Sequence, residues 1–209
     1  MPLVHMHEVD GCFYERDCYN EYYHLIEDLI VNMHKQCVTV TGTPGIGKSL
    51  FYAYFFERFM KSHFERWIVV AATFEHTDRV TQFSIFENDI DNPTTEELFA
   101  NDVVMAIEVN AIMIREKEQA EANGVEPRKM LFLCSGPSPA VWQQSVVFTS
   151  FNADWMRLSK TRSLCIDMPL WITEELQHAV HVLGFDLDDT IIAEMCDFWR
   201  CCTTVLSRC

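Results

Sequence analysis

The sequence predicts an α/β domain in which helices flank a mostly parallel sheet. Three observations predict this class. Short apolar segments of strand length alternate with longer segments of helical length, and a glycine-rich turn joins one such strand to one such helix. The chain also has 209 residues, 49% of them hydrophobic and only 22% charged, which is enough apolar material for the core of one domain.

The first third of the chain gives the clearest elements. A helix is expected over 19–35, where tyrosine, leucine and isoleucine recur at helical spacing. Residues 36–42 form a short β-branched run that ends in a glycine, which predicts a strand entering a turn. The segment 48–63 contains neither glycine nor proline and has helical length, so it predicts the following helix.

A hairpin is expected next, with strands at 65–75 and 79–88. After the break at Asn92-Pro93, the run Thr94-Thr95-Glu96-Glu97 resembles a capping box and predicts a long helix that ends at Gly124. Three buried strands and two C-terminal helices complete the prediction. The strands are 130–134, 145–150 and 163–168, and the helices are 173–183 and 188–199.

These elements suggest three parts of the chain. Residues 1–35 form a helical lead-in, 36–170 the α/β core, and 171–209 the C-terminal helices.

Composition excludes several classes of function. The net charge of −15 disfavours general nucleic-acid binding, because the phosphate backbone would be repelled. No apolar stretch reaches the roughly 18 residues of a membrane span, and no signal peptide is expected at the N-terminus. The nine cysteines contain no C-x-x-C pair, so reduced thiols are expected rather than a zinc site.

The turn between the predicted strand 36–42 and the predicted helix 48–63 has the pattern G-x-x-x-x-G-K-S, which is typical of a phosphate-binding P-loop. Its residues are Gly42, Thr43, Pro44, Gly45, Ile46, Gly47, Lys48 and Ser49. Glycines allow positive φ and let the backbone approach phosphates, while consecutive N–H groups at a helix N-terminus form a nest for an anion. ATP is therefore the expected ligand.

Roles for the two polar side chains follow from the same pattern. Lys48 is expected to contact the β- and γ-phosphates as a catalytic residue, and the Ser49 hydroxyl to ligate Mg²⁺. Hydrolysis also needs an acidic residue at the end of a second strand. Asp167, which ends the run LCID, is the best match, although a solvated strand end is an equally good interpretation. Glu108 is expected on the surface of a helix.

Polar residues after the strand 145–150 are further candidates. Asn152 is expected to contact the nucleotide and Arg157 to sense the γ-phosphate, with an ordinary polar loop as the alternative.

Several segments together resemble one family. VTVTGTPGIGKSLFYAYFFERF, TSFNADWMRLSK and MPLWITEEL are similar to the P-loop NTPase domain of the Crinkler effectors, which retrotransposon-hot-spot proteins share. The resemblance runs from about Gly11 to Phe198. It implies an AAA-like domain that binds and hydrolyses ATP, with Asn152 and Trp155 in a strand-end motif. It also implies an effector that is secreted and acts in the host cell, often in the nucleus, where a host protein or a second copy would be its partner.

Two departures from the family pattern stand out. Relatives end this strand in an Asp-Gly pair, whereas this chain has Ser135-Gly136, so Ser135 stands in place of the metal-associated acid and hydrolysis is in doubt. Relatives also end in a Phe-Gly-Gly segment followed by Ala-Arg. Codons for residues 198–203, read one base forward, can encode Phe-Gly-Gly-Val-Ala-Arg. We therefore predict a frameshift from about Trp199, which leaves the C-terminal helical part incomplete.

Two alternatives to an ATPase remain open from the sequence. One is an interaction module that binds nucleotide without turnover, which Ser135 favours. The other is a small nucleotide kinase, for which MRLSKTR is the single candidate for an arginine-rich lid.

Overall fold

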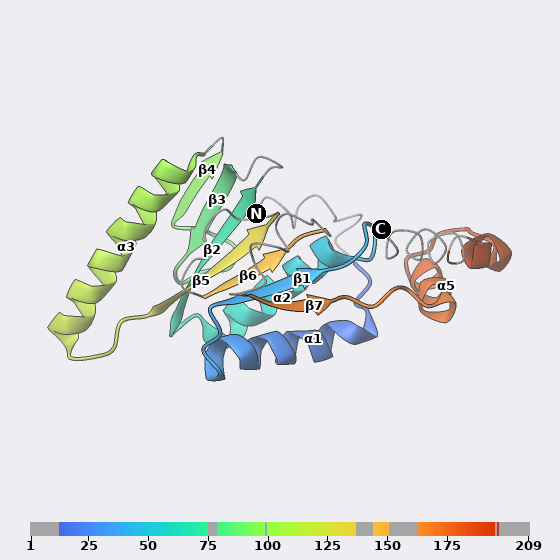
Figure 1. The fold of residues 1–209 in the computed structure, drawn as a ribbon, viewed down its shortest axis with the longest axis horizontal. Helices are drawn as coiled ribbons and strands as arrows, with labels where there is room; N and C mark the ends of the chain where they lie inside the picture. Colours follow the sequence, from blue (N-terminus) through green and yellow to red (C-terminus); the bar gives the residue numbers. More distant parts are fainter. Residues whose placement is uncertain are drawn as a thin grey trace.

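A central sheet organises the structure, which is a computed structural model (Figure 1). It describes residues 13–74, 79–98, 100–136, 144–150, 163–194 and 196. In these segments the sheet has seven strands in the order β4-β3-β2-β5-β6-β1-β7. The strands are β1 (Cys37–Thr41), β2 (Trp67–Phe74), β3 (Val80–Phe86), β4 (Thr95–Leu98), β5 (Lys129–Ser135), β6 (Ser145–Phe148) and β7 (Ser163–Asp167).

Strand directions confirm the predicted mostly parallel sheet. β2, β5, β6, β1 and β7 are parallel to their neighbours within this group, whereas β3 and β4 pair antiparallel at one edge. The predicted hairpin is confirmed, because β2 and β3 pair from Val69–Phe86 to Phe74–Val80. Parallel strands place their carboxyl ends at the same edge of the sheet, and this edge is where α/β proteins bind ligands.

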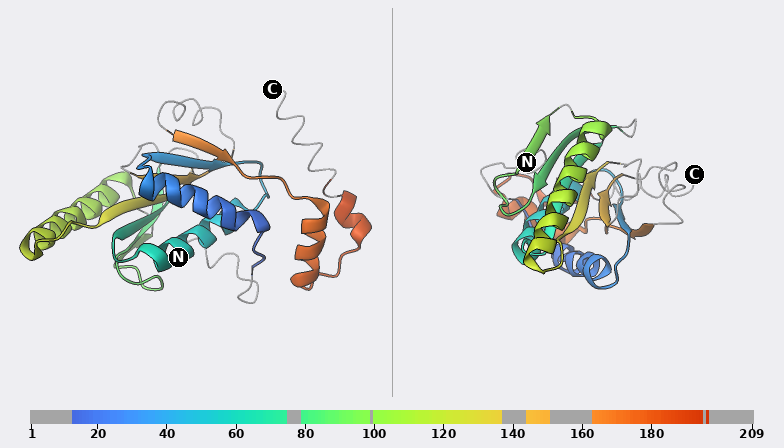
Figure 2. Two further views of the ribbon diagram at one scale, coloured as in Figure 1. Left: turned by 90° about the horizontal axis from the view of Figure 1, so that it is seen from below. Right: turned by 90° about the vertical axis from the view of Figure 1, so that its left-hand side faces the viewer.

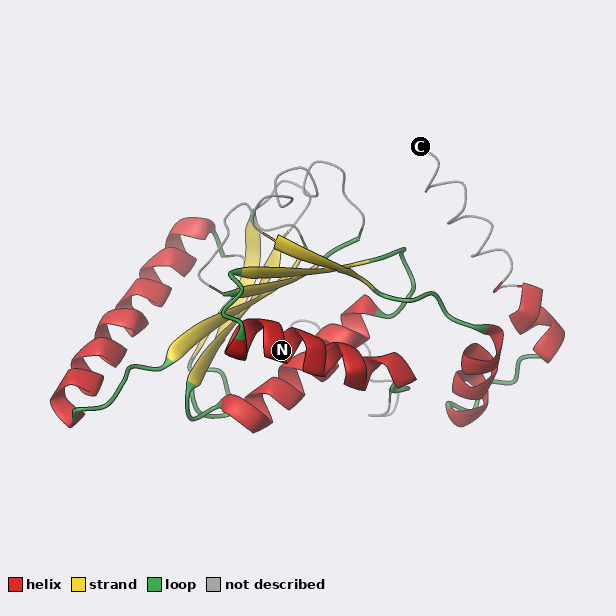
Figure 3. Ribbon diagram, turned by 60° about the horizontal axis from the view of Figure 1, so that its bottom comes forward, coloured by secondary structure: helices red, strands yellow, loops and turns green. Residues whose placement is uncertain are grey.

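Helices cover both faces of the sheet (Figures 1 and 3). The helices are α1 (Asp17–Glu27), which continues into a π-helical turn (Asp28–Asn32), α2 (Lys48–His63), α3 (Asp102–Asn123) and α5 (Thr173–Val182). The first two pack on one face, where they share a core with β1, β5 and β6, and α3 packs on the other. No helix in the described ranges is long and apolar enough to cross a membrane.

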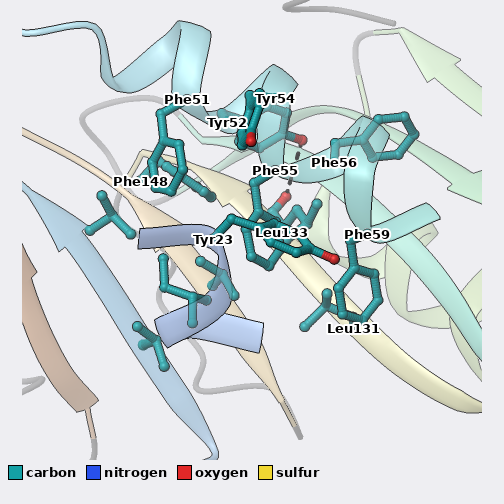
Figure 4. Close-up of a cluster of buried hydrophobic side chains, with 14 of the residues drawn as sticks. Tyr23, Phe51, Tyr52, Tyr54, Phe55, Phe56, Phe59, Leu131, Leu133 and Phe148 are labelled. Carbon is teal, nitrogen blue, oxygen red and sulfur yellow. Dashed lines mark hydrogen bonds between the residues drawn. The ribbon is translucent and has the colours of Figure 1, made fainter. Parts of the chain in front are cut away.

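Aromatic side chains of α2 anchor that helix beneath the parallel strands (Figure 4). Phe51, Phe55 and Phe59 lie four residues apart, which places them on one face of a helix, and all three are fully buried. Phe51 meets Phe148 of β6 with ring centroids 5.9 Å apart, and Phe55 stacks on Phe59 at 5.6 Å. Burial of each ring stabilises the fold by about 1.5–3 kcal/mol, so α2 begins at a fixed place beside β1.

The predicted start of the long helix at Thr94 was wrong. Thr95–Leu98 is instead the edge strand β4, paired with β3 at Ile85–Thr95 and Ser84–Glu96. The helix begins at Asp102, because the Asn101 side chain accepts hydrogen bonds from the N–H groups of Val103 and Val104. A local capping pattern was therefore overridden by strand pairing and by a better cap seven residues later.

α5 stands apart from the sheet (Figure 2). Neither the strands of the sheet nor α1, α2 and α3 pack extensively against it, and Ala179 is its buried residue. Residues 189–194 are also helical, in agreement with the second predicted C-terminal helix, and the predicted frameshifted end lies outside the described residues.

Candidate functional site

The glycine loop (42–49) connects the buried strand β1 to the first turn of α2. Its three glycines all have positive φ, at 141° for Gly42, 83° for Gly45 and 94° for Gly47. β1 runs through the core with all five residues buried, so the loop starts from a rigid base at the carboxyl edge of the sheet. The backbone thus takes the left-handed turns that the glycine pattern predicted.

The glycines at both ends of this loop also lie close to the ends of neighbouring side chains. A Cβ on Gly42 would lie 2.2 Å from Cδ1 of Ile46, which packs across the loop. A Cβ on Gly47 would lie 2.7 Å from Oη of Tyr19. The loop therefore folds closely upon itself and against α1, and a larger residue at either glycine would be strained by the positive φ as well as crowded by these side chains.

The Lys48 side chain folds over the loop. Its Nζ donates hydrogen bonds to the carbonyl oxygens of Gly42 at 2.9 Å and Thr43 at 2.8 Å. Burial lowers the pKa of Lys48 below its ordinary value, because the charged ammonium loses part of its hydration. The two carbonyl oxygens hold this cation at the centre of the turn, where a phosphate oxygen would compete with them for it.

Two side chains from outside the loop fix the orientation of its peptide groups. Nη1 of Arg16 donates to the carbonyl oxygen of Ile46 at 2.9 Å, and Oη of Tyr19 donates to that of Gly47 at 2.9 Å. In a trans peptide the N–H points away from the carbonyl, and the described chain contains no cis bond. The N–H groups of Gly47 and Lys48 therefore point away from Arg16 and Tyr19.

No pattern in the sequence indicated a role for Arg16. It precedes α1, and its main partner Glu175 lies 159 positions later. Nothing short of the tertiary structure reveals such a pair.

Asp167 lies beside the base of the loop. It ends β7 opposite Thr41, the last residue of β1, and its side chain is exposed. Its backbone carbonyl accepts a hydrogen bond from Oη of Tyr22 at 2.8 Å. The structure thus brings Asp167 to the same edge as Lys48, one strand away from β1.

Ser135 ends β5 at this edge too. It aligns with Phe148 of β6, which aligns in turn with Val40 of β1. Two strand spacings separate β5 from β1, or roughly 10 Å. The hydroxyl of Ser135 therefore lies at the edge where an acidic residue would face the loop, and it carries no charge.

Hydroxyl groups near the loop offer further contacts. Ser49 is exposed in the first turn of α2. Oγ1 of Thr41 and Oγ1 of Thr43 are buried and have no hydrogen-bond partner within the described part of the chain. A buried hydroxyl without a partner costs about 1–3 kcal/mol, so these two groups are suited to a polar ligand at the loop.

Not every predicted residue can be placed. Asn152, Trp155 and Arg157 lie outside the described residues. Glu108 lies on α3, as expected, and that helix packs beside β3 rather than β1. Among the described residues no group of three His, Cys, Asp or Glu side chains could hold a metal.

A groove of about 730 Å³ lies away from the glycine loop. Residues from α3 and from the start of β5 line it, including Met113, Glu116, Arg128 and Met130. It opens at the amino end of β5, whereas the glycine loop follows the carboxyl end of β1. The groove and the glycine loop are separate features.

No protein-family model matches the chain. A comparison with curated protein sequences finds no match either.

Proposed function

We propose that this chain is an AAA-like P-loop NTPase domain that binds ATP together with Mg²⁺. One observation carries the proposal. The glycine loop joins a buried strand to a helix N-terminus, holds Lys48 at its centre, and has two successive peptide groups oriented from outside by Arg16 and Tyr19. The position of β1 between β6 and β7 supports it, because ligands of α/β sheets bind at carboxyl strand ends where the strand order reverses.

Each residue of the loop has a part in this proposal. The N–H groups after Gly42, Gly45 and Gly47 would cradle the phosphates, and Lys48 would pair with them. Ser49 and Asp167 would hold Mg²⁺, which usually takes one or two protein ligands and fills its other positions with phosphate oxygens and water. When bound, the metal would neutralise charge on the phosphates. Thr41 and Thr43 would gain polar partners for their hydroxyls.

A second candidate is nucleotide binding without turnover. Ser135 favours it, because a neutral hydroxyl stands at the strand end where the charge of an acid would act on the metal. The resemblance to Crinkler effectors supports both candidates. On that resemblance we propose that the protein acts inside a host cell, with a host protein or a second copy as its partner.

Titration calorimetry with MgATP tests the binding proposal. Lys48→Ala is expected to weaken binding by about 10- to 100-fold, because charge-assisted hydrogen bonds are worth about 1.5–3 kcal/mol. Lys61→Ala is the matched control, since Lys61 lies on the same helix and is 65% exposed. Wild-type protein that binds no ATP, or a Lys48→Ala variant that binds as tightly as wild type, would overturn the proposal.

Steady-state phosphate release separates the two candidates. If the protein binds without turnover, wild type releases no phosphate above the Lys48→Ala background, and Ser135→Asp raises the rate. Rapid release by wild type that Lys48→Ala abolishes would instead establish the ATPase.

A further inference from the structure

Arg16 is a buried cation beside the glycine loop that donates five hydrogen bonds. It is 1% exposed, and each of its five N–H donors has an acceptor. Nε and Nη2 donate hydrogen bonds to the two carboxylate oxygens of Glu175, at 2.9 and 2.8 Å. Nη1 binds the carbonyls of Ile46 at 2.9 Å and Pro169 at 3.0 Å, and Nη2 that of Leu170 at 3.2 Å.

This one side chain joins three segments that are distant in sequence. Ile46 belongs to the glycine loop, Pro169 and Leu170 follow β7, and Glu175 lies in the first turn of α5. The guanidinium also lies over the ring of Trp171, 4.2 Å from its centroid. Because every N–H group of Arg16 already has an acceptor, the loss of one partner is expected to shift the guanidinium relative to the others.

α5 depends on this attachment. It lies beyond the end of the sheet (Figure 3), and neither the strands of the sheet nor α1, α2 and α3 pack extensively against it. Two side-chain interactions tie it to the segment before α1. They are the bidentate Arg16–Glu175 pair and a hydrogen bond of 3.0 Å between Oη of Tyr14 and Nδ1 of His178. A shift of Arg16 would therefore release or tilt α5.

A chain of contacts connects Lys48, at the centre of the loop, to Arg16. Lys48 now occupies the carbonyls of Gly42 and Thr43, and a triphosphate would compete for that ammonium. Ile46 packs on Gly42 through Cδ1, and its carbonyl is the group that Arg16 holds. A change at positions 42 and 43 therefore reaches the Arg16 contact through a single side chain.

We propose that Arg16 is a positioning residue that couples triphosphate occupancy of the glycine loop to the attachment of α5. The inference rests on the proposed nucleotide binding. When Glu175 holds the guanidinium, the carbonyl of Ile46 is kept turned toward the buried Arg16, and the N–H of Gly47 points away from Arg16, where it would be free to meet an anion. By thermodynamic linkage, nucleotide that prefers this loop geometry must strengthen the attachment of α5 by the same factor.

Glu175→Gln in the full chain tests the coupling, with Glu174→Gln as the matched control. Glu174 is the adjacent, exposed carboxylate of the same helix turn. We expect Glu175→Gln to weaken MgATP binding at least about 5-fold, the lower end of typical coupling, and Glu174→Gln to change it less than 2-fold. Hydrogen–deuterium exchange of residues 173–182 in wild type is expected to slow when MgATP is added, and to respond less in Glu175→Gln.

The outcomes separate this inference from the proposed function. Wild type that binds MgATP with unchanged exchange in 173–182, and a Glu175→Gln variant with wild-type affinity, would overturn the coupling and leave nucleotide binding standing. Wild type that binds no MgATP would overturn both. If Glu175→Gln does not fold by circular dichroism, the exchange of wild type with and without MgATP still decides, because a purely structural salt bridge would give no nucleotide-dependent change.

Discussion

Two arginine clusters stabilise opposite ends of the parallel strands. Arg16 lies at the carboxyl edge, under the glycine loop, and is 1% exposed. Arg128 lies at the amino end of β5, where its side chain is 19% exposed. It binds both carboxylate oxygens of Glu116 at 2.9 and 2.6 Å, together with the carbonyl of Glu87 and Oδ1 of Asn88. Both side chains form a bidentate pair and complete it with carbonyl groups.

The two clusters differ in what they join. Arg128 ties α3 to the turn after β3, so it holds one layer of the fold to another and touches no residue of the glycine loop. Arg16 ties the glycine loop to α5, which does not pack extensively on the sheet. A bidentate arginine–glutamate pair therefore holds two layers of the fold together in the Arg128 cluster. In the Arg16 cluster, by our inference, the same kind of pair positions the ligand site.

The largest expected effect is on stability, from Arg16→Met. The change leaves the Glu175 carboxylate, 10% exposed, without its cation, and breaking a buried pair costs about 3–5 kcal/mol. Arg128→Met is expected to cost less, about 1–3 kcal/mol, because Arg128 is itself 19% exposed and Arg115 stays close to both Glu87 and Glu116. Urea denaturation gives both free energies of unfolding. A larger loss for Arg128→Met would reverse the comparison.

The next effect is on nucleotide affinity. Arg16→Lys keeps the positive charge but replaces a planar fork of five donors with three, so it cannot hold Glu175 and Ile46 together. We expect MgATP affinity to fall about 10-fold, the equivalent of one charge-assisted hydrogen bond of about 1.4 kcal/mol. Arg128→Lys removes a similar fork at the other end of the strands. Calorimetry should find its affinity within 2-fold of wild type, and an equal loss in both variants would mean that Arg16 has no special link to the loop.

Sequence reasoning succeeded where local pattern determines structure. The strand 36–42, the glycine turn and the helix 48–63 were predicted because residues within a few positions of one another set their conformation. It failed at Thr94-Thr95-Glu96-Glu97, since pairing with β3 outweighs a local cap. It missed Arg16 altogether, because the contacts that bury this arginine come from positions 46, 169, 170 and 175.

A smaller expected effect is the pH dependence of the stability that the Arg128–Glu116 pair contributes. The hydrogen bond from Arg128 lowers the pKa of Glu116, against the opposing effect of burial. A lowered folded-state pKa stabilises the protein above the ordinary value of 4.5, and that stabilisation is lost as the pH falls through the folded-state value. The stability difference between wild type and Glu116→Gln should therefore narrow below about pH 4.5.

Urea denaturation between pH 3 and 7 measures this difference, with the exposed Glu118→Gln as control. A difference for Glu116→Gln that stays constant with pH would show that Arg128 does not favour the charged carboxylate.

The smallest effect concerns the second anchor of the glycine loop. Tyr19→Phe removes one hydroxyl, whose hydrogen bond to the Gly47 carbonyl helps to orient the N–H of Lys48. We expect a loss of about 0.5–1.5 kcal/mol in unfolding free energy and a few-fold weaker MgATP binding. Tyr23→Phe is the matched control, because Tyr23 is buried on the same helix and its hydroxyl donates to Oε1 of Glu27, away from the glycine loop. If both variants weaken binding equally, the anchors act through general packing of α1. A selective effect of Tyr19→Phe would show that the orientation of individual loop peptides contributes to affinity.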